Sequence, residues 1–283
     1  MNLQAWLGET PQKTFVEQHY YRQPFSGPCA SAAAVALGSW ETLATILPDP
    51  NADVLLVRRN EQRAGETPRT LVEAQSLVGQ GCTLLVRHAE RQHAGLAQLA
   101  AGFARDFAAP VNIHLYVTPG DEYGFSWHYD AEEVFILQTT GRKTYSLRKN
   151  TVNPWPIEET LPQNMRYERE IMPLMQSTLA AGDWLYIPSG WWHKGAALPG
   201  EPAISLALGV MARTGVDVFD LLRREVLDSL LWRQRLPVLG AAAAIDSASQ
   251  RDAVRTMLQA LADDAARLLR SEKLLDAVVA PQA

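Results

Sequence analysis

The sequence predicts a mainly β fold, a barrel or sandwich, with α/β elements before it and a helical segment after it. Three observations carry this prediction. Residues 111–210 contain short apolar strands separated by clusters of Gly and Pro. Residues 1–110 mix candidate strands with candidate helices. After Arg213 apolar residues recur at three- and four-residue steps, which is the spacing of amphipathic helices.

The N-terminal region reads as α/β. Two leucine- and valine-rich runs, at 53–57 and 82–87, are expected to form buried strands. The segment 70–78 between them is expected to be helical, as are 12–20 and the amphipathic stretch 95–107.

The central region alternates strands with turns. The expected strands are VNIHLYV, EEVFILQTT, KTYSLRK, DWLYIP and AISLALGV, and the turns are PGDEYG, TTGR, IPSG and LPGEP. Many short strands divided by turn residues are typical of a barrel or sandwich. We therefore expect one domain over 1–212, with its barrel core at about 111–210.

The C-terminal region, 213–283, is expected to form amphipathic helices. Apolar residues at helical spacing are Val218, Phe219, Leu222, Val226 and Leu230, followed by Val254, Met257, Leu258, Leu261, Ala265 and Leu268. The apolar faces of these helices must pack on the barrel or on a second subunit. We expect the second case, a homodimer.

The composition narrows the class of protein. Hydrophobic residues make up 47% and charged residues 20% of the 283 residues, enough apolar side chains for a packed core. The net charge of −5 provides no general attraction to nucleic acid or acidic membranes. We see no membrane span and no signal peptide, and two cysteines are too few for a disulfide framework. We therefore expect a cytoplasmic protein.

One constellation suggests a metal site. His128 and Asp130 are two residues apart, so on an extended chain their side chains point to the same face. A third ligand can come from a distant strand, where WWHKG supplies His193. Two imidazoles and a carboxylate leave open positions and suit Fe(II). Taken alone, each residue is more often a chance occurrence, and only their joint presence favours a metal site.

Lys143 is the second unusual feature. Arg142, Thr144, Ser146 and Arg148 alternate along the strand as polar residues that face water, which turns Lys143 inward. A buried ammonium is costly unless an anion meets it, and a bound dicarboxylate would meet it. Alternatively, Lys143 extends out of the barrel mouth or pairs with an internal acidic residue.

The segment HYDAEEVFILQTTGRKTYSL, with TPGDEYGFS before it and AAGDWLYIPSGWWHKG after it, resembles the JmjC-type 2-oxoglutarate oxygenases, especially their ribosomal-protein hydroxylase branch. The resemblance covers about residues 111–210. It implies a double-stranded β-helix, the jelly-roll of cupins, with N-terminal α/β elements and a C-terminal helical dimerisation segment.

The resemblance also implies roles for individual residues. His128, Asp130 and His193 would hold Fe(II), and Lys143 would pair with the distal carboxylate of 2-oxoglutarate, which Tyr116 could also hydrogen-bond. The alternative for Tyr116 is an ordinary barrel-filling side chain.

Two positions depart from the family. His114 stands where that branch usually has asparagine, and Ser205 stands where asparagine or threonine is often found. Both are candidate co-substrate contacts. For His114, a substrate contact or a structural histidine are alternatives.

The implied activity is hydroxylation of a C–H bond, with O₂ and 2-oxoglutarate consumed and succinate and CO₂ released. A protein side chain is the expected substrate, with a ribosomal protein as the candidate. Alternatives are a small molecule, an RNA nucleotide, or a cupin-like metal protein or zinc hydrolase without oxygenase activity. The loop 119–127 and the stretch 150–177 are candidate substrate elements, although 150–177 could be a simple connection.

Overall fold

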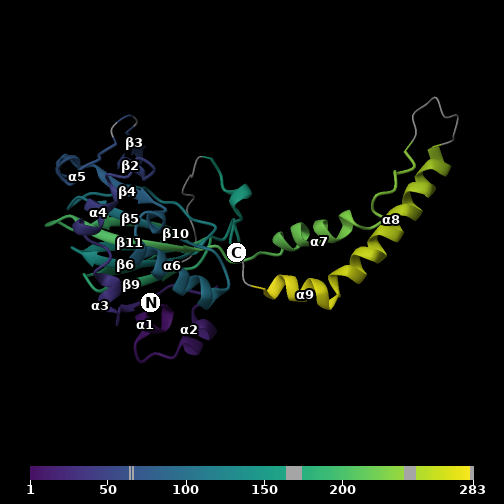
Figure 1. Ribbon diagram of the computed structural model, residues 1–283, viewed down its shortest axis with the longest axis horizontal. Helices are drawn as coiled ribbons and strands as arrows, with labels where there is room; N and C mark the ends of the chain where they lie inside the picture. The colour runs from purple at the N-terminus through teal and green to yellow at the C-terminus, as the bar shows by residue number, and fades with distance from the viewer. Residues whose placement is uncertain (64, 66, 164–173, 239–246, 281–283) are drawn as a thin grey trace. The chain divides into compact units, whose positions relative to one another are not determined.

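The computed structural model describes residues 1–63, 65, 67–163, 174–238 and 247–280 (Figure 1). The chain forms two compact units, Met1–Ala212 and Arg213–Gln282. Unit 1 holds the strands and the N-terminal helices, and unit 2 holds α7, α8 and α9.

Two antiparallel sheets build unit 1. The larger has the order β1-β9-β6-β11-β5-β4-β2-β3, and the smaller has the order β10-β7-β8. The bounds are β1 Phe25–Pro28, β2 Asp53–Arg58, β3 Glu61–Gln62, β4 Thr83–Arg87, β5 Val111–Thr118, β6 Glu133–Thr140, β7 Lys143–Arg148, β8 Met175–Leu179, β9 Asp183–Ile187, β10 Trp192–Ala197 and β11 Ala203–Val210. The predicted fold class is confirmed: a mainly β core, with α/β elements before it and helices after it.

Helices precede and interrupt the strands of unit 1. They are α1 Leu3–Leu7, α2 Gln12–Gln18, α3 Ala32–Val35, α4 Trp40–Ile46, α5 Leu71–Gly79 and α6 Ala94–Phe107, with 3-10 turns at Ala89–Arg91 and Glu158–Thr160. The predicted helices at 12–20, 70–78 and 95–107 are confirmed as α2, α5 and α6. Thr70 and Glu73 close a capping box at the start of α5, which fixes where that helix begins.

Strand β6 is buried on both faces. Phe135 and Leu137 pack in the larger core with the helices, whereas Val134 and Ile136 pack in a smaller core between the two sheets. Because successive side chains point to opposite faces, the strand reads as a continuous apolar run. The space between the sheets beyond the smaller core is where the site lies.

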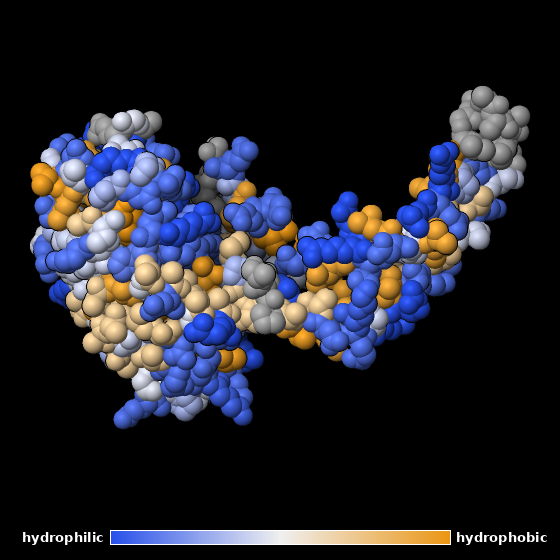
Figure 2. All heavy atoms as spheres, viewed as in Figure 1, coloured by the Kyte–Doolittle hydropathy of each residue, from blue (hydrophilic) through white to orange (hydrophobic). Residues whose placement is uncertain are grey.

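Unit 2 consists of α7 Asp217–Leu227, α8 Ser247–Leu269 and α9 Glu272–Val279. In its described part, the buried hydrophobic side chains are Leu222 and Leu274. Figure 2 shows apolar patches along these helices. The exposed large hydrophobic residues of unit 2 are Val216, Phe219, Leu227, Leu230, Leu236, Val238, Leu258, Leu269, Leu275 and Val279.

Two expectations about the whole chain can be compared with the structure. Cys29 and Cys82 are free thiols. Of the helices in the described ranges, none is both long and apolar enough to cross a bilayer.

Candidate metal centre

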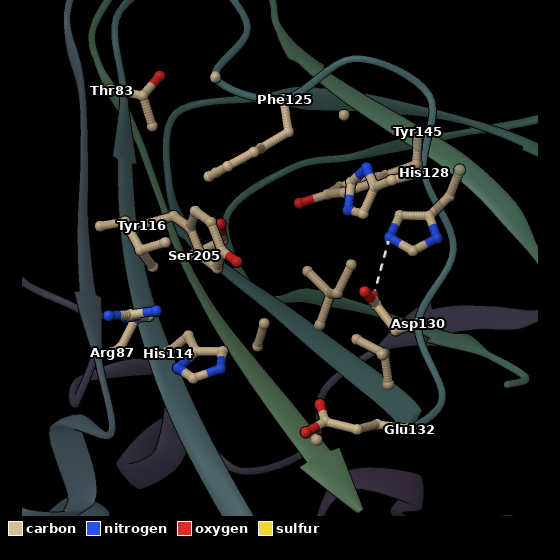
Figure 3. A pocket seen from close by; sticks show the side chains of 18 of the residues that line it. Thr83, Arg87, His114, Tyr116, Phe125, His128, Asp130, Glu132, Tyr145 and Ser205 are labelled. Atoms are coloured by element: carbon tan, nitrogen blue, oxygen red, sulfur yellow. Dashed lines mark ion pairs between the residues drawn. The ribbon is translucent and has the colours of Figure 1, made fainter. Parts of the chain in front are cut away.

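His128, Asp130 and His193 converge in unit 1, although two come from the segment before β6 and one from β10. One ligand atom of each lies within 4.8 Å of the others. An isolated antiparallel bridge pairs the two histidines: the His128 N–H donates to the His193 carbonyl at 3.1 Å, and the reverse bond is 2.8 Å. The histidine Nε2 of His193 lies 3.4 Å from the Asp130 carboxylate, which faces the rings in Figure 3. The backbone pairing therefore sets the spacing of the three side chains.

Both imidazoles are oriented by backbone carbonyls two residues earlier. Nδ1 of His128 lies 2.8 Å from the Ser126 carbonyl, and Nδ1 of His193 lies 3.0 Å from the Trp191 carbonyl. A carbonyl accepts, so Nδ1–H donates and the Nε2 lone pair remains for a ligand. Burial and the neighbouring His128 lower the pKa of His193 to about 4, so this ring is neutral at neutral pH. Two imidazoles and one carboxylate fit a divalent iron ion.

The three side chains line a pocket of about 370 Å³ between the sheets. Side chains from both sheets and from the segments that join them contribute to its wall. Its wall combines apolar side chains with charged, imidazole and hydroxyl groups, and a concave site of this size is typical of small-molecule binding.

Lys143 lies inside this pocket, as the alternation along β7 predicts. It is 6% exposed, and Nζ donates to the Thr118 hydroxyl at 3.2 Å. The rings of Tyr116 and Tyr145 lie 5.5 and 5.6 Å from Nζ. Burial lowers the pKa of Lys143 to about 8.

The two alternatives for Lys143 are wrong within the described ranges. The side chain does not extend to solvent, and no described carboxylate lies within 4.0 Å of Nζ. Thr118 supplies one neutral acceptor, whereas an ammonium has three N–H donors. The lysine end of the pocket is therefore suited to an anion.

Tyr116 and Ser205 line the same pocket and are register partners on β5 and β11. The Ser205 side chain hydrogen-bonds the Tyr145 hydroxyl. Gly195 on β10 makes room here, because an added Cβ would lie 2.8 Å from the Tyr145 ring and 3.0 Å from Lys143 Cε. A side chain at this position would fill the space beside the lysine.

His114 lines the pocket farther along β5. Its Nδ1 accepts the backbone N–H of His88 at 3.2 Å, and burial lowers its pKa to about 4. It is therefore a neutral ring whose Nε2–H is a donor. Figure 3 shows Arg87 and His114 on one side of the pocket and Glu132 across from them, below Asp130.

Sequence reasoning missed Glu132, Asn112, Thr118 and Gly195. Glu132 lines the pocket and accepts a hydrogen bond from Asn112 Nδ2 at 2.6 Å, and burial raises its pKa to about 7. The sequence could have predicted this, because Glu132 follows Asp130 by two residues, and residues two apart on an extended chain share a face. Thr118 follows Tyr116 by two residues in the same way.

The two candidate substrate loops contribute unequally. From 119–127, Gly124 and Phe125 line the pocket, whereas Tyr123 lies under Lys194, with its ring centroid 3.7 Å from Nζ. From 150–177, Glu158 and Leu161 line the pocket, and residues 164–173 lie outside the described residues.

The sequence was compared with protein families and curated proteins. Residues 88–218 match the model of the JmjC domain. The chain is 27% identical over 212 residues to a bifunctional lysine-specific demethylase and histidyl-hydroxylase NO66 from Drosophila mojavensis, covering 71% of this chain and 24% of that protein. It is 29% identical over 140 residues to human ribosomal oxygenase 1, covering 50% of this chain and 22% of that protein. The chain thus spans about a quarter of the length of these relatives.

The structure was compared with solved structures. The ribosomal oxygenase YcfD from Escherichia coli, in complex with cobalt and 2-oxoglutarate, superposes with a TM-score of 0.60 at 20% identity. The match covers 95% of this chain and 69% of that chain. A second structure of E. coli YcfD gives a TM-score of 0.59 at 22% identity, covering 90% and 68%. These likenesses show a shared fold.

Proposed function

We propose that this chain is an Fe(II)- and 2-oxoglutarate-dependent dioxygenase that hydroxylates a C–H bond of a protein side chain. The proposal is supported by the match of residues 88–218 to the JmjC domain and by the similarity of half of the chain to human ribosomal oxygenase 1. The observation that carries the proposal is the pocket itself. It joins His128, Asp130 and His193 to a buried ammonium that lacks an anion in the described part of the chain.

His128, Asp130 and His193 would hold the iron through two Nε2 atoms and one carboxylate. Lys143, Tyr116 and Ser205 would bind the distal carboxylate of 2-oxoglutarate, and His114 would contact the co-substrate or the substrate. Bound iron and 2-oxoglutarate would supply the oxidising chemistry, with O₂ consumed and succinate and CO₂ released.

The residues of this chain orient the metal ligands and bury the lysine charge. The carbonyls of Ser126 and Trp191 hold the two rings, so their Nε2 atoms are oriented before a ligand arrives. Lys143 is buried, and burial strengthens the pairing of its charge with a carboxylate. A zinc hydrolase or an inactive cupin has no use for such a lysine, which favours the oxygenase.

The names of the relatives support a protein substrate, with a ribosomal protein as the first candidate. The overall negative charge gives no general support for an RNA substrate. A small molecule is the remaining alternative, and a substrate screen with ribosomal proteins from the source cell separates the two.

The test is succinate formation from 2-oxoglutarate by the purified protein with Fe(II) and O₂, with binding of 2-oxoglutarate measured in parallel by calorimetry on the Mn(II)-loaded protein. We expect slow turnover without substrate, stimulation by a protein substrate, and no turnover in an Asp130→Ala variant. Absence of both turnover and co-substrate binding in the wild type would contradict the proposal.

We also propose a homodimer formed by unit 2. Its described helices bury Leu222 and Leu274, whereas ten other large apolar side chains are exposed, Phe219 at 69% and Leu230 at 76% among them. Surfaces of this kind are usually covered by a partner. Light scattering should give a dimer for the full chain and a monomer for residues 1–212. The same number of chains per particle in both samples would contradict the proposal. With two free cysteines and this activity, the cytoplasm is the proposed compartment.

A further inference from the structure

Asp130 is held in the fold differently from the two histidines. His193 belongs to β10, and His128 pairs with it in the isolated bridge. Asp130 follows this bridge by two residues and precedes β6, which begins at Glu133. In the described part of the chain, no strand pairing includes Asp130, so other contacts must fix its backbone. The position of that backbone decides whether the carboxylate can meet the imidazoles at one ion.

The turn between β9 and β10, residues 188–191, supplies these contacts. It passes from the larger sheet to the smaller one. The Gly190 N–H donates to the Asp130 carbonyl at 2.9 Å. The Ser189 hydroxyl donates to the Ala131 carbonyl at 3.0 Å and lies 3.5 Å from the Asp130 carbonyl. The turn thus bonds to two consecutive peptide groups at the carboxylate ligand.

The same turn is anchored on both of its other sides. The Ser189 N–H donates to the Glu133 carboxylate at 3.3 Å, and the Tyr186 hydroxyl donates to the other oxygen of that buried carboxylate. At the end of the turn, the Trp191 carbonyl accepts a hydrogen bond from Nδ1 of His193 at 3.0 Å. The turn therefore contacts the backbone at one metal ligand and the ring of another.

The shape of the turn depends on a glycine. Gly190 has a φ of +77°, and an added Cβ would lie 2.8 Å from the Pro154 carbonyl oxygen. Both facts restrict this position to glycine. Of the bonds from the turn to residues 130 and 131, those of the Ser189 hydroxyl come from a side chain. A substitution at Ser189 can therefore remove them while the backbone bond of Gly190 stays.

We propose that Ser189 is a positioning residue for the metal, its hydroxyl holding the peptide groups of Asp130 and Ala131 so that the Asp130 carboxylate faces the two imidazoles before an ion binds. The inference rests on the proposed function, since it takes these three side chains as the iron ligands. Removing a group that orients a metal ligand commonly weakens metal binding about 10- to 100-fold. Ser189 acts through the backbone, and the Gly190 bond remains without it, so we expect the lower end of this range.

The test uses the full-length protein with Mn(II) and Co(II) as the probes. Calorimetry gives the Mn(II) dissociation constant, and visible absorption of the Co(II)-loaded protein reports the number and geometry of the ligands. Ser189→Ala should bind Mn(II) about tenfold more weakly and shift the Co(II) absorption bands. Ser189→Thr keeps the hydroxyl and should restore both readouts close to the wild-type values.

Thr139→Val is the matched control. The Thr139 hydroxyl donates to the Ile204 carbonyl at 3.0 Å, which is the same kind of bond at the same distance, near the far end of β6. This variant shows what the loss of one such bond does to the fold alone. Its Mn(II) affinity should stay within about twofold of the wild type, and its Co(II) spectrum should not change.

Three results would overturn the proposal. They are wild-type Mn(II) affinity in Ser189→Ala, an equal loss of affinity in Ser189→Ala and Thr139→Val, and a loss in Ser189→Thr as large as that in Ser189→Ala. A wild type that binds no Mn(II) removes the proposed function and this inference together. A wild type that binds Mn(II) but not 2-oxoglutarate removes the proposed function alone, and the variants still decide the role of Ser189.

Discussion

Replacing Lys143 with methionine removes a buried ammonium and keeps a side chain that fills most of its volume. Burial lowers the pKa of Lys143 from 10.5 to about 8. At 1.4 kcal/mol per unit, the charged lysine costs the ligand-free fold roughly 3 kcal/mol. Allowing for the lost bond to Thr118, we expect Lys143→Met to raise the free energy of unfolding of the ligand-free protein by about 1–3 kcal/mol.

The same change should weaken 2-oxoglutarate binding. Removing one partner of a buried ion pair leaves the other charge unpaired and costs about 3–5 kcal/mol, or roughly 10²- to 10³-fold in the dissociation constant. Mn(II) affinity should stay within about twofold, because no hydrogen bond or ion pair in the described part of the chain joins Lys143 to His128, Asp130 or His193. Calorimetry measures the two affinities, and chemical denaturation measures the stability.

The pH dependence provides an internal check. Between the folded pKa of about 8 and the unfolded value of 10.5, the unfolded chain binds more protons at Lys143 than the folded chain does. The stability of the ligand-free wild type should therefore gain from this group as pH rises through that interval. Lys143→Met should lack this gain.

Lys149→Met, a change at an exposed lysine just after the same strand, is the matched control and should alter neither affinity nor the pH profile. Equal loss of metal and co-substrate affinity in Lys143→Met would refute the reasoning, since it would put the lysine at the metal. Unchanged 2-oxoglutarate binding would refute it as well.

Two further changes test the site, and a third tests a buried hydrogen bond outside it. Asp130→Ala should abolish saturable Mn(II) binding and leave the melting temperature of the metal-free protein nearly unchanged; retained binding in calorimetry would exclude Asp130 as a ligand. Gly195→Val should block the lysine end, because even a Cβ there lies 2.8 Å from the Tyr145 ring, and 2-oxoglutarate binding should fall while Mn(II) binding persists. Tyr186→Phe removes the hydroxyl that donates to buried Glu133 and should lower the free energy of unfolding by about 1–3 kcal/mol, and an unchanged denaturation midpoint would contradict this role.

Much of the fold was predictable because its signals are local. The alternation along β7 placed Lys143 inside, and the runs at 53–57 and 82–87 are strands β2 and β4. The assigned roles of the site residues stay predictions, but the sequence spacing already paired His128 with Asp130 on one face.

Other elements carried no such signal. Strand β10, WHKGAA, has no apolar alternation, and it is a strand because it pairs with β7. The expected order of strands in the sheets could not be read either, because β11 lies between β5 and β6, its partners from distant parts of the chain. Such pairings depend on long-range contacts that no local window contains.

The sequence by itself determined which residue types are available: a His-x-Asp pair, a later histidine, and a lysine at an inward position. Only the tertiary structure decided that His193 bonds to His128 through the backbone, and that Glu132, which lines the pocket, meets Asn112 and Gly209. The physical reason is one of range. The face to which a strand residue points follows from the alternation of side chains along the strand. Contacts across a pocket depend instead on how two sheets pack together.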